Sequence, residues 1–505
     1  MWTIRTRTGS QMPTHTIDRP DQRITRGAIG TPPPRGNAQK PARSIVGGLP
    51  NAPSGGPRVR KPHPGPLSHL DFIAFLAVNI VVIGGMWLRH GGLGQIADPG
   101  GQFIAAGQLA ALYGTFAVLV QIALISRAPW LERRYGMDEL NYLHRWTGFF
   151  AATLLVAHAG LTTWGYADSN GVDIIGQTWD FIAHWPDVLA AIVGLVLFLA
   201  VAVTSMKAAR RALDYETWWF IHLYAYLAVI ISFAHQIAVG PDFTSDRPAR
   251  IYWAALYGLT AVLVLGFRWL TPLVNAFRYR LRVAEVVRHS PDVVSVVLRG
   301  HRLDRMKVES GQFFLLRFLT RDRWWKAHPI SVSAAPDGRS LRFTIKALGD
   351  DTTALQFVRP GTRVMAEGPY GTFTAARARS RRLVLIGGGI GITPLRAMYE
   401  DLDRRPGDVD LLYRARSRDQ AILADELAQI SRQRGFGLHF SFSRPDGRRR
   451  RSNPFNPAHL KRLIPDIAQR DVYICGPSAL VSAATNGLRK AGVPRHQIHA
   501  ERFGY

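Results

Sequence analysis

The sequence of 505 residues contains a single cysteine, Cys475. This excludes a disulfide within the chain, a CxxC zinc site and a cysteine-held iron–sulfur cluster. Acidic residues are also scarce: 36 Asp and Glu stand against 63 Lys and Arg, and the formal net charge is +27. No apolar segment follows the early charges, so we expect no signal peptide. The sequence also has no helix–loop–helix calcium motif, which gives no reason to expect calcium gating.

The positive charge by itself would suggest a nucleic-acid partner. However, 47% of the residues are hydrophobic and the mean hydropathy is −0.01, which is too apolar for a purely soluble chain of this charge. Lys and Arg concentrate in the first 66 residues and in loops that flank apolar runs. This distribution is typical of the cytoplasmic flanks of membrane spans, so we expect a lipid bilayer as partner and no nucleic acid.

Residues 1–66 are rich in Pro, Gly, Arg, Ser and Thr, with the stretches TPPPRG and KPHPGP, and they show no apolar periodicity. This composition predicts a disordered basic tail.

Six apolar runs follow, each close to the ~20 residues needed to cross a bilayer. They are Leu70–Arg89, Phe103–Ile125, Tyr142–Trp164, Val188–Met206, Trp218–Val239 and Ile251–Leu273. We therefore predict a six-helix transmembrane bundle over residues 67–276. Lys and Arg are concentrated in the tail, in the loops after the second and fourth runs, and in the segment after the sixth run. This predicts a multi-pass protein of the cytoplasmic membrane with both termini in the cytoplasm.

Beyond residue 280 the pattern changes to short strands. LRVAEVVRH, VVSVVLRG, GQFFLLRF and LRFTIKAL predict a small β-barrel over residues 277–378. RRLVLIGGGIGITPLRAMYEDL and VDLLYRARS then begin an alternation of buried strands and helices. This alternation is typical of a doubly wound α/β domain, here placed over residues 379–505, so the fold class is multidomain.

Four histidines lie inside the apolar runs: His144 and His158 in the third, and His222 and His235 in the fifth. The two runs cross the membrane in the same direction, so the first histidines share one depth and the second ones another. Spacings of 14 and 13 residues separate the levels by about 20 Å at ~1.5 Å per residue. Two levels with one imidazole from each helix predict the ligation of two haem irons across the bilayer, and coordination offsets the cost of polar groups in lipid.

The angular positions of these histidines are less regular. At ~100° per residue, fourteen residues return to within about 40° of the same face, whereas thirteen leave the second side chain about 220° away. The fifth helix is therefore either locally tightened or kinked, or its haems approach from different sides.

Three motifs in the second half favour nucleotide cofactors. HPISVSAAP follows a barrel strand and lets Ser331 and backbone N–H groups approach a flat polar ring. IKALGDDTTAL supplies Lys346 and a Gly/Thr turn suited to a pyrophosphate. Two turns are predicted at the ends of buried strands, where open α/β sheets bind ligands. One is GGGIGITPL, which follows RLVLI, and the other is at the end of VYICGP. Taken singly, each motif is also compatible with an ordinary loop.

Three arginines in the last domain suit the 2′-phosphate of NADPH, because guanidinium groups bind phosphate through paired charge-assisted bonds. They are Arg414, Arg416 and Arg444. No acidic residue ends the second strand to bind a free ribose, so NADPH is favoured, while NADH remains open.

The order of these parts resembles the ferric reductase and NADPH oxidase superfamily: six spans with paired histidines, then HPISVSAAP, GDDT, EGPYG, GGGIGITP and CGP. The resemblance covers residues 70–505. It implies that His144 with His222 holds an inner haem b, and that His158 with His235 holds an outer one. It also implies FAD as a cofactor.

The resemblance carries further residues into cofactor roles. The flavin ring is expected at His328, Pro329, Ile330 and Ser331, and the FAD pyrophosphate at Lys346, Gly349 and Thr352. The nicotinamide nucleotide is expected at Gly387, Gly388, Gly389, Gly391, Thr393 and Pro394, with Cys475, Gly476 and Pro477 on the nicotinamide side. A C-terminal aromatic stacks on the flavin in this family. Phe503 matches that position, and Tyr505 lies two residues beyond it, so the choice between them stays open.

The resemblance implies an oxidoreductase that passes electrons from cytoplasmic NAD(P)H through FAD and two haems to a small-molecule acceptor outside the membrane. The acceptor is a ferric chelate or dioxygen. Thr162 stands where oxidase members often carry a second histidine, and the second span has no arginine, which weakens the oxidase interpretation. Two alternatives remain: a six-span haem-containing sensor or channel with a degenerate flavodomain, and a reductase that feeds a partner protein at the outer face.

Overall fold

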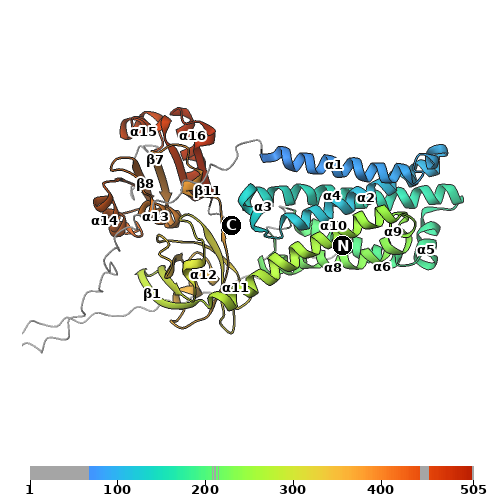
Figure 1. Ribbon diagram of the computed structural model, residues 1–505, viewed down its shortest axis with the longest axis horizontal. Coiled ribbons are helices and arrows are strands. Elements are labelled where there is room, and N and C mark those ends of the chain that lie inside the picture. The colour runs from blue at the N-terminus through green and yellow to red at the C-terminus, as the bar shows by residue number, and fades with distance from the viewer. Residues whose placement is uncertain (1–67, 207–208, 210–211, 214, 444–453, 503–505) are drawn as a thin grey trace, which may run out of the picture. The chain divides into compact units, whose positions relative to one another are not determined.

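The computed structural model describes residues 68–502 except 207–208, 210–211, 214 and 444–453. The tail predicted over residues 1–66 therefore lies outside the described residues. All described residues belong to one compact unit within Val59–Tyr505. They form a helical part up to residue 279 and a strand-containing part from residue 282 (Figure 1).

Each of the six apolar runs is helical. The helices of this part are α1 (Ser68–Arg89), α2 (Pro99–Leu124), α3 (Pro129–Tyr135), α4 (Met137–Asn170), α5 (Ile174–His184), α6 (Val188–Thr204), α8 (Tyr215–Val239), α9 (Pro241–Thr244), α10 (Arg247–Leu263) and α11 (Thr271–Tyr279). A π-helical segment, η2 (Val264–Leu270), joins α10 to α11 without a break. A short 3-10 turn, η1 (Gly94–Ala97), precedes α2.

Among the described residues, four helices are long and apolar enough to cross a membrane. The count rises to five if α5 and α6, which meet at 115°, form one bent span. Helix α4 is not among them, although its 34 residues are long enough. The count of six spans therefore stays a prediction.

Helices α2 and α4 pack closely along a row of glycines. Gly100, Gly107 and Gly114 recur every seven residues of α2. A side chain at either of the first two would collide with α4, and one at Gly114 would be in tight contact with it. The nearest atoms belong to Gly165 and Ser169 at the first glycine, to Thr162 at the second, and to Leu154 and Leu155 at the third. Small residues at this spacing let two helix backbones approach, which is how helices associate within lipid. The seam fixes which residues of α2 and α4 face each other.

Six strands form two three-stranded antiparallel sheets around one apolar core. The first sheet has the order β1 (Arg282–Ser290), β2 (Val293–Arg299), β5 (Ser340–Lys346), and the second β4 (His328–Ser331), β3 (Phe313–Phe318), β6 (Val364–Tyr370). Isolated bridges Arg282–Arg363 and Val332–Phe343 connect the sheets. Fully buried Phe314 and Phe343 meet edge to face in the core. The predicted strands are thus present, and a short helix, α12 (Asp350–Ala354), follows β5.

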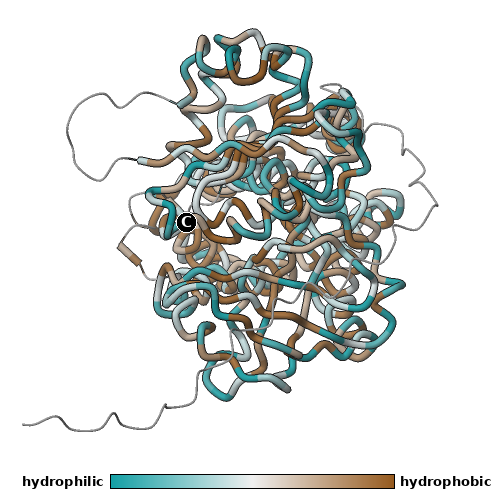
Figure 2. The backbone as a smooth tube through the Cα atoms, turned by 90° about the vertical axis from the view of Figure 1, so that its left-hand side faces the viewer, coloured by the Kyte–Doolittle hydropathy of each residue, from teal (hydrophilic) through white to brown (hydrophobic). Residues whose placement is uncertain are grey.

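The last part contains a five-stranded parallel sheet in the order β11 (Ile498–Arg502), β10 (Asp471–Gly476), β7 (Leu383–Gly388), β8 (Val409–Ala415), β9 (Gly437–Phe442). Helices α13 (Ile392–Asp401) and α14 (Ala424–Arg434) cover one face, and α15 (Pro457–Leu463) and α16 (Ser478–Lys490) cover the other (Figure 1). In Figure 2 many of the outer loops are hydrophilic. The chain runs β7, β8, β9 to one side and then crosses to β10, so strand order reverses between β7 and β10, where such sheets bind ligands.

Candidate functional site

The histidines of α4 are both held by backbone carbonyls of α2. His144 Nδ1 lies 3.0 Å from the carbonyl oxygen of Gln121, and His158 Nδ1 lies 3.0 Å from that of Gly107. A carbonyl only accepts, so Nδ1 donates in each pair and Nε2 is left unprotonated. The two carbonyls are fourteen residues apart, as are the two histidines. Because α2 and α4 pack antiparallel along Gly100, Gly107 and Gly114, the same histidine–carbonyl hydrogen bond occurs at two depths.

The histidines of α8 face those of α4. The rings of His144 and His222 have their centroids 6.1 Å apart. His158 and His235 are close enough to interact electrostatically. His222 Nδ1 lies 3.2 Å from the hydroxyl of Ser205, and His235 Nδ1 is buried without a hydrogen-bond partner among the described residues. The structure therefore brings the four predicted ligands together in the two predicted pairs.

The first pair fits an iron between its rings. Two bonds of about 2 Å from a metal to imidazole nitrogen, plus the distance from each nitrogen to its ring centre, give centroids about 6 Å apart. A ligating histidine almost always donates its other N–H to a carbonyl or carboxylate, and both α4 imidazoles do so. The residues present thus suit haem iron held by one histidine on each side.

Helix α8 is one uninterrupted α-helix, so the structure shows no tightened segment between His222 and His235. A kink in the helix, and haems that approach from different sides, both stay open as explanations for the spacing of thirteen.

The predicted flavin-ring residues form strand β4. His328 to Ser331 pair antiparallel with Leu316 to Phe313 of β3. The hydroxyl of Ser331 is buried and has no hydrogen-bond partner among the described residues. An unsatisfied buried hydroxyl is costly unless a bound group supplies the partner, so this position fits the polar edge of a flavin. Burial lowers the pKa of His328 below its usual range, so its imidazole is neutral at pH 7.

The predicted pyrophosphate residues lie at the end of β5 and the start of α12. The Lys346 ammonium is 3.4 Å from the Asp292 carboxylate. The Thr352 hydroxyl accepts the backbone N–H groups of Leu348 (2.8 Å) and Gly349 (3.1 Å). These donors are therefore occupied by the protein's own side chain. Binding of a pyrophosphate here would require Thr352 to release them.

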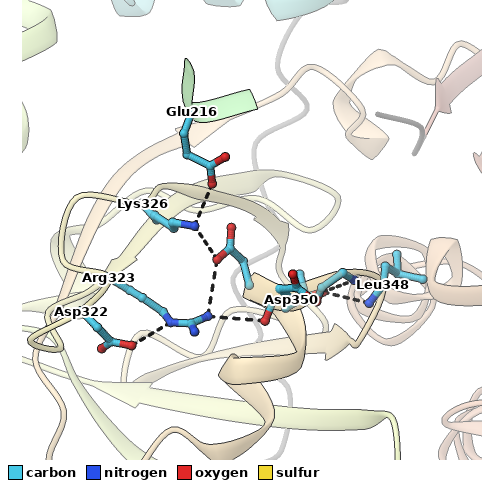
Figure 3. A network of polar contacts seen from close by, with 9 residues as sticks. Glu216, Asp322, Arg323, Lys326, Leu348 and Asp350 are labelled. Carbon is cyan, nitrogen blue, oxygen red and sulfur yellow. Dashed lines mark hydrogen bonds and ion pairs between the residues drawn. The ribbon is translucent and has the colours of Figure 1, made fainter. Parts of the chain in front are cut away.

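An ionic network surrounds this turn (Figure 3). Lys326 Nζ lies 2.7 Å from Glu216, in the first turn of α8, and 2.7 Å from Asp351 of α12. Arg323 also contacts Asp351, at 3.4 Å. Lys326 therefore connects the helix that carries His222 and His235 with the sheet region that carries His328. Although burial opposes it, pairing with the two carboxylates raises the pKa of Lys326.

A second connection joins the loop after α2 to strand β6. The carboxylate of Glu367, which is only 3% exposed, forms ion pairs with both Arg127 and Arg317. The buried carboxylate of Glu132 in α3 accepts the backbone N–H of Gly371 at 2.7 Å. These contacts connect the helical part with the strands, and removal of either arginine would leave the buried Glu367 carboxylate with one partner fewer.

The two glycine turns predicted for the nicotinamide nucleotide lie against each other. Gly387 and Gly388 end β7, Gly389 and Gly391 form the turn, and Thr393 and Pro394 stand in the first turn of α13. Gly476 ends β10 at φ +155°, which only glycine adopts readily, and Pro477 precedes α16. A side chain at Gly391 would collide with the backbone of Cys475 and Gly476. Both helix N-termini thus open at the topological switch point, which suits a phosphate-bearing ligand.

Cys475 is fully buried in the core beside Tyr473 and Phe373. Burial, assisted by the neighbouring Glu501 carboxyl, raises the pKa of the thiol well above its usual value. The thiol stays protonated, so it does not serve as a nucleophile. The structure places this thiol in the core of the domain, and its role on the nicotinamide side stays a prediction.

Of the three predicted phosphate arginines, Arg414 lies in β8 beside Gly388 of β7. Its guanidinium bonds to Ser441 Oγ (2.8 Å) and to the carbonyl of Phe442 (3.1 Å). It lines a cavity of about 270 Å³ together with residues including Tyr413, His439 and His459. Arg416 is exposed just after the strand. Arg444, Phe503 and Tyr505 lie outside the described residues.

The sequence patterns did not indicate Glu501, which lies beside Cys475 in the pairing of β11 with β10. Its Oε2 is buried without a hydrogen-bond partner among the described residues. Burial, together with the carboxylates of Asp138 and Glu132, raises its pKa to about 8. Two of these three acids come from the helical part, so no local pattern could have revealed the environment.

Glu501→Gln is expected to stabilise the chain increasingly as pH rises. The folded-state pKa is raised, so folding favours the neutral carboxyl, and stability is lost as pH rises from about 4.5 towards 8. At about 1.36 kcal/mol per pKa unit the effect at pH 8 is a few kcal/mol, with about 5 kcal/mol as the upper bound. Thermal unfolding of both proteins at pH 5 and pH 8 measures it. An equal difference in Tm at the two pH values would contradict the assignment.

Three family models match the chain in succession. They are "Ferric reductase like transmembrane component" over residues 110–233, "FAD-binding domain" over 278–374 and "Oxidoreductase NAD-binding domain" over 385–486. The first contains His144, His158 and His222 and ends two residues before His235. The second contains the HPIS strand, and the third contains both glycine turns.

Similar proteins match between about a third and a half of the chain. An NADPH oxidoreductase of Mycobacterium tuberculosis is 26% identical over 241 residues, which span 46% of this chain and 62% of that protein. Ferredoxin–NADP reductase B of Sorangium cellulosum is 30% identical over 189 residues, 34% of this chain and 76% of its own length. The crystal structure of the flavohem-like FAD/NAD-binding domain of nitric oxide dioxygenase from Vibrio cholerae is 26% identical and matches at a TM-score of 0.38, covering 45% of this chain and 99% of that one.

The succession of models matches the order predicted from the sequence: a helical part with paired histidines, then a flavin module, then a nicotinamide-nucleotide module. The chain belongs to the ferric reductase and NADPH oxidase superfamily, in which a transmembrane helical domain is fused to an NAD(P)H-dependent flavin oxidoreductase.

Proposed function

We propose that this protein carries electrons from cytoplasmic NAD(P)H through FAD and two b-type haems to an acceptor on the other side of the membrane. The observation that carries the proposal is the pairing of four histidines at two depths, with both α4 imidazoles oriented by α2 carbonyls. NAD(P)H gives up a hydride whereas haem iron accepts single electrons, and FAD supplies the conversion between the two when bound. The protein orients the groups and excludes water.

In this proposal His144 and His222 hold the inner haem, and His158 and His235 hold the outer one. The buried Ser331 hydroxyl supplies a hydrogen bond to the flavin. The two glycine turns admit the nicotinamide nucleotide between β7 and β10. The predicted orientation, with both termini in the cytoplasm, places this nucleotide site on the NAD(P)H side of the bilayer.

A ferric chelate is the acceptor that we favour over dioxygen. Thr162, one turn beyond His158, bonds through its hydroxyl to the Nδ1 of that ligand at 3.2 Å, and it stands where oxidase members often carry a histidine. The residue thus supports the haem ligand and adds no proton donor of its own near neutral pH. A partner protein at the outer face is the alternative acceptor.

The experiment that tests the function is anaerobic reduction of the purified chain in detergent, supplied with FAD. Addition of NADPH should produce a reduced-minus-oxidised haem spectrum, and ferric citrate should then reoxidise it. With dioxygen as acceptor, dye reduction that superoxide dismutase suppresses would instead indicate an oxidase. No oxidation of NADPH or NADH would favour a sensor or channel with a degenerate flavodomain.

Arg414→Gln is expected to weaken NADPH use by about tenfold to a hundredfold in kcat/KM, since a charge-assisted phosphate contact contributes about 1.5 to 3 kcal/mol. NADH has no 2′-phosphate, so its kcat/KM should change little. Steady-state reduction of ferricyanide with each nucleotide measures the ratio. An equal loss of kcat/KM with NADPH and NADH would mean that Arg414 maintains the structure through Ser441 and does not bind the 2′-phosphate.

A further inference from the structure

Arg268 occupies an irregular segment at the end of the last long helix. Pro272 lacks an N–H, and its ring excludes the normal helical bond to the carbonyl four residues earlier, that of Arg268. The preceding segment η2 takes the π form, and both the backbone N–H and the hydroxyl of Thr271 bond to the carbonyl of Gly266. Such turns inside helices are frequent at functional sites because they redirect single side chains.

The redirected side chain reaches the end of α2. Arg268 Nη1 lies 3.2 Å from the carbonyl oxygen of Ile125, while the carbonyl of Gln121 accepts from His144. Residues 121 and 125 lie on one face of α2, separated by about 6 Å along its axis. The guanidinium therefore stands about one turn beyond the His144 ring. It is close enough to act electrostatically on both His144 and His222, and on Tyr370 at the end of β6.

The described part of the chain gives this guanidinium no carboxylate. Among the described residues, its five N–H donors make one hydrogen bond, to Ile125. The buried carboxylates nearby are taken, Glu367 by Arg127 and Arg317, and Glu132 by the N–H of Gly371. A cation within an apolar helical segment is costly without an anionic partner. A bound group that carries an anion would complete the site.

We propose that Arg268 binds a propionate carboxylate of the inner haem. This inference rests on the proposed function, which places that haem between His144 and His222. Haem b carries two carboxylates at one edge, and Arg268 lies beside the ligand pair, towards the strands that carry the flavin residues. Its charge favours the ferrous over the ferric iron, because reduction adds an electron next to a cation. Arg268 thereby raises the potential of the inner haem and assists electron arrival from the flavin.

The test is a redox titration of haem absorbance for Arg268→Gln, made both in the full chain and with His158→Ala, which leaves the inner haem as the only one. The equilibrium constant for reducing the inner haem should fall about tenfold, which is 59 mV for one electron. Arg268→Lys should restore most of the potential. Arg278→Gln is the matched control: it removes an exposed charge from α11 of the same helical run and should leave the potential unchanged.

Unchanged midpoints in Arg268→Gln with both haems bound would overturn the proposal, and would point to a lipid phosphate as the partner. An equal fall at both haems would overturn it too. Should the Gln variant not fold, infrared difference spectra of the native chain decide the matter: haem reduction should shift guanidinium bands that Arg268→Lys lacks, and no such shift would refute the contact. Loss of all haem from the native chain would instead reject the proposed function.

Discussion

His158→Ala is expected to lower the haem content from two per chain to one and to stop electron delivery across the membrane, while NADPH still reduces the flavin and the inner haem. The reason is geometric. His158 is the α4 ligand of the outer pair, fixed by the carbonyl of Gly107, and His144 and His222 form a separate pair at the other depth. Pyridine haemochrome content and anaerobic stopped-flow reduction by NADPH measure the two effects.

His184→Ala is the matched control for this experiment. His184 ends α5, is exposed, and pairs with Asp180 at 2.9 Å, so its loss should leave two haems. A spectrum of His158→Ala that still shows two haems would contradict the ligand assignment.

Gly391→Ala is expected to reduce NAD(P)H-driven haem reduction by about a hundredfold, the typical cost of displacing a reacting group by about 1 Å. A Cβ at position 391 would collide with the carbonyl of Cys475 and lie 2.7 Å from the Cα of Gly476. These are backbone atoms, which cannot move aside as a flexible side chain can. The two turns would separate, and the nucleotide would lose its position between β7 and β10. Dithionite, which bypasses the nucleotide, should still reduce both haems.

Gly258→Ala in α10 provides the comparison, since a Cβ there meets nothing within 4 Å. It should match the native chain with both reductants. If Gly391→Ala retained the native rate with NADPH, the turn between β7 and α13 would not be the nucleotide site.

Much of the architecture was predictable from local patterns. Long apolar runs gave the helices, and buried β-branched strands followed by glycine turns gave the parallel sheet and its switch point. The number of membrane spans was not settled by the same patterns. Helix α4 is long but does not reach the apolarity of a span, and α5 and α6 meet at 115°.

The histidine pairs could be predicted because imidazole is a metal-binding side chain that the sequence shows directly. The groups that hydrogen-bond to these histidines could not be predicted. Gln121 and Gly107 act through backbone carbonyls, which leave no mark on residue type. The glycines of α2, which are seven residues apart, do indicate a close helix contact. The sequence alone does not show that α4 is the helix in contact. The angular irregularity of α8 was also anticipated. The structure shows a continuous α-helix between His222 and His235, which excludes a locally tightened turn as the cause.

Electrostatic interactions between residues far apart in the chain could not be predicted from the sequence. Glu501 acquires its raised pKa from burial and from acids far away in the chain. Arg268 lies in a π-helical segment and bonds to the carbonyl of Ile125 at the end of another helix. The predicted pyrophosphate turn also differed in one respect, because Thr352 accepts the N–H groups that were expected to be open. Each of these features depends on partners from another element.

The most direct measurement of the central claim is the haem-to-protein ratio of the full chain purified after expression with excess porphyrin precursor, followed by anaerobic NADPH. Four histidines in two pairs predict a Soret band that corresponds to two low-spin haems per chain, both reducible by NADPH once FAD is present. A purified, folded chain without Soret absorbance would contradict the account.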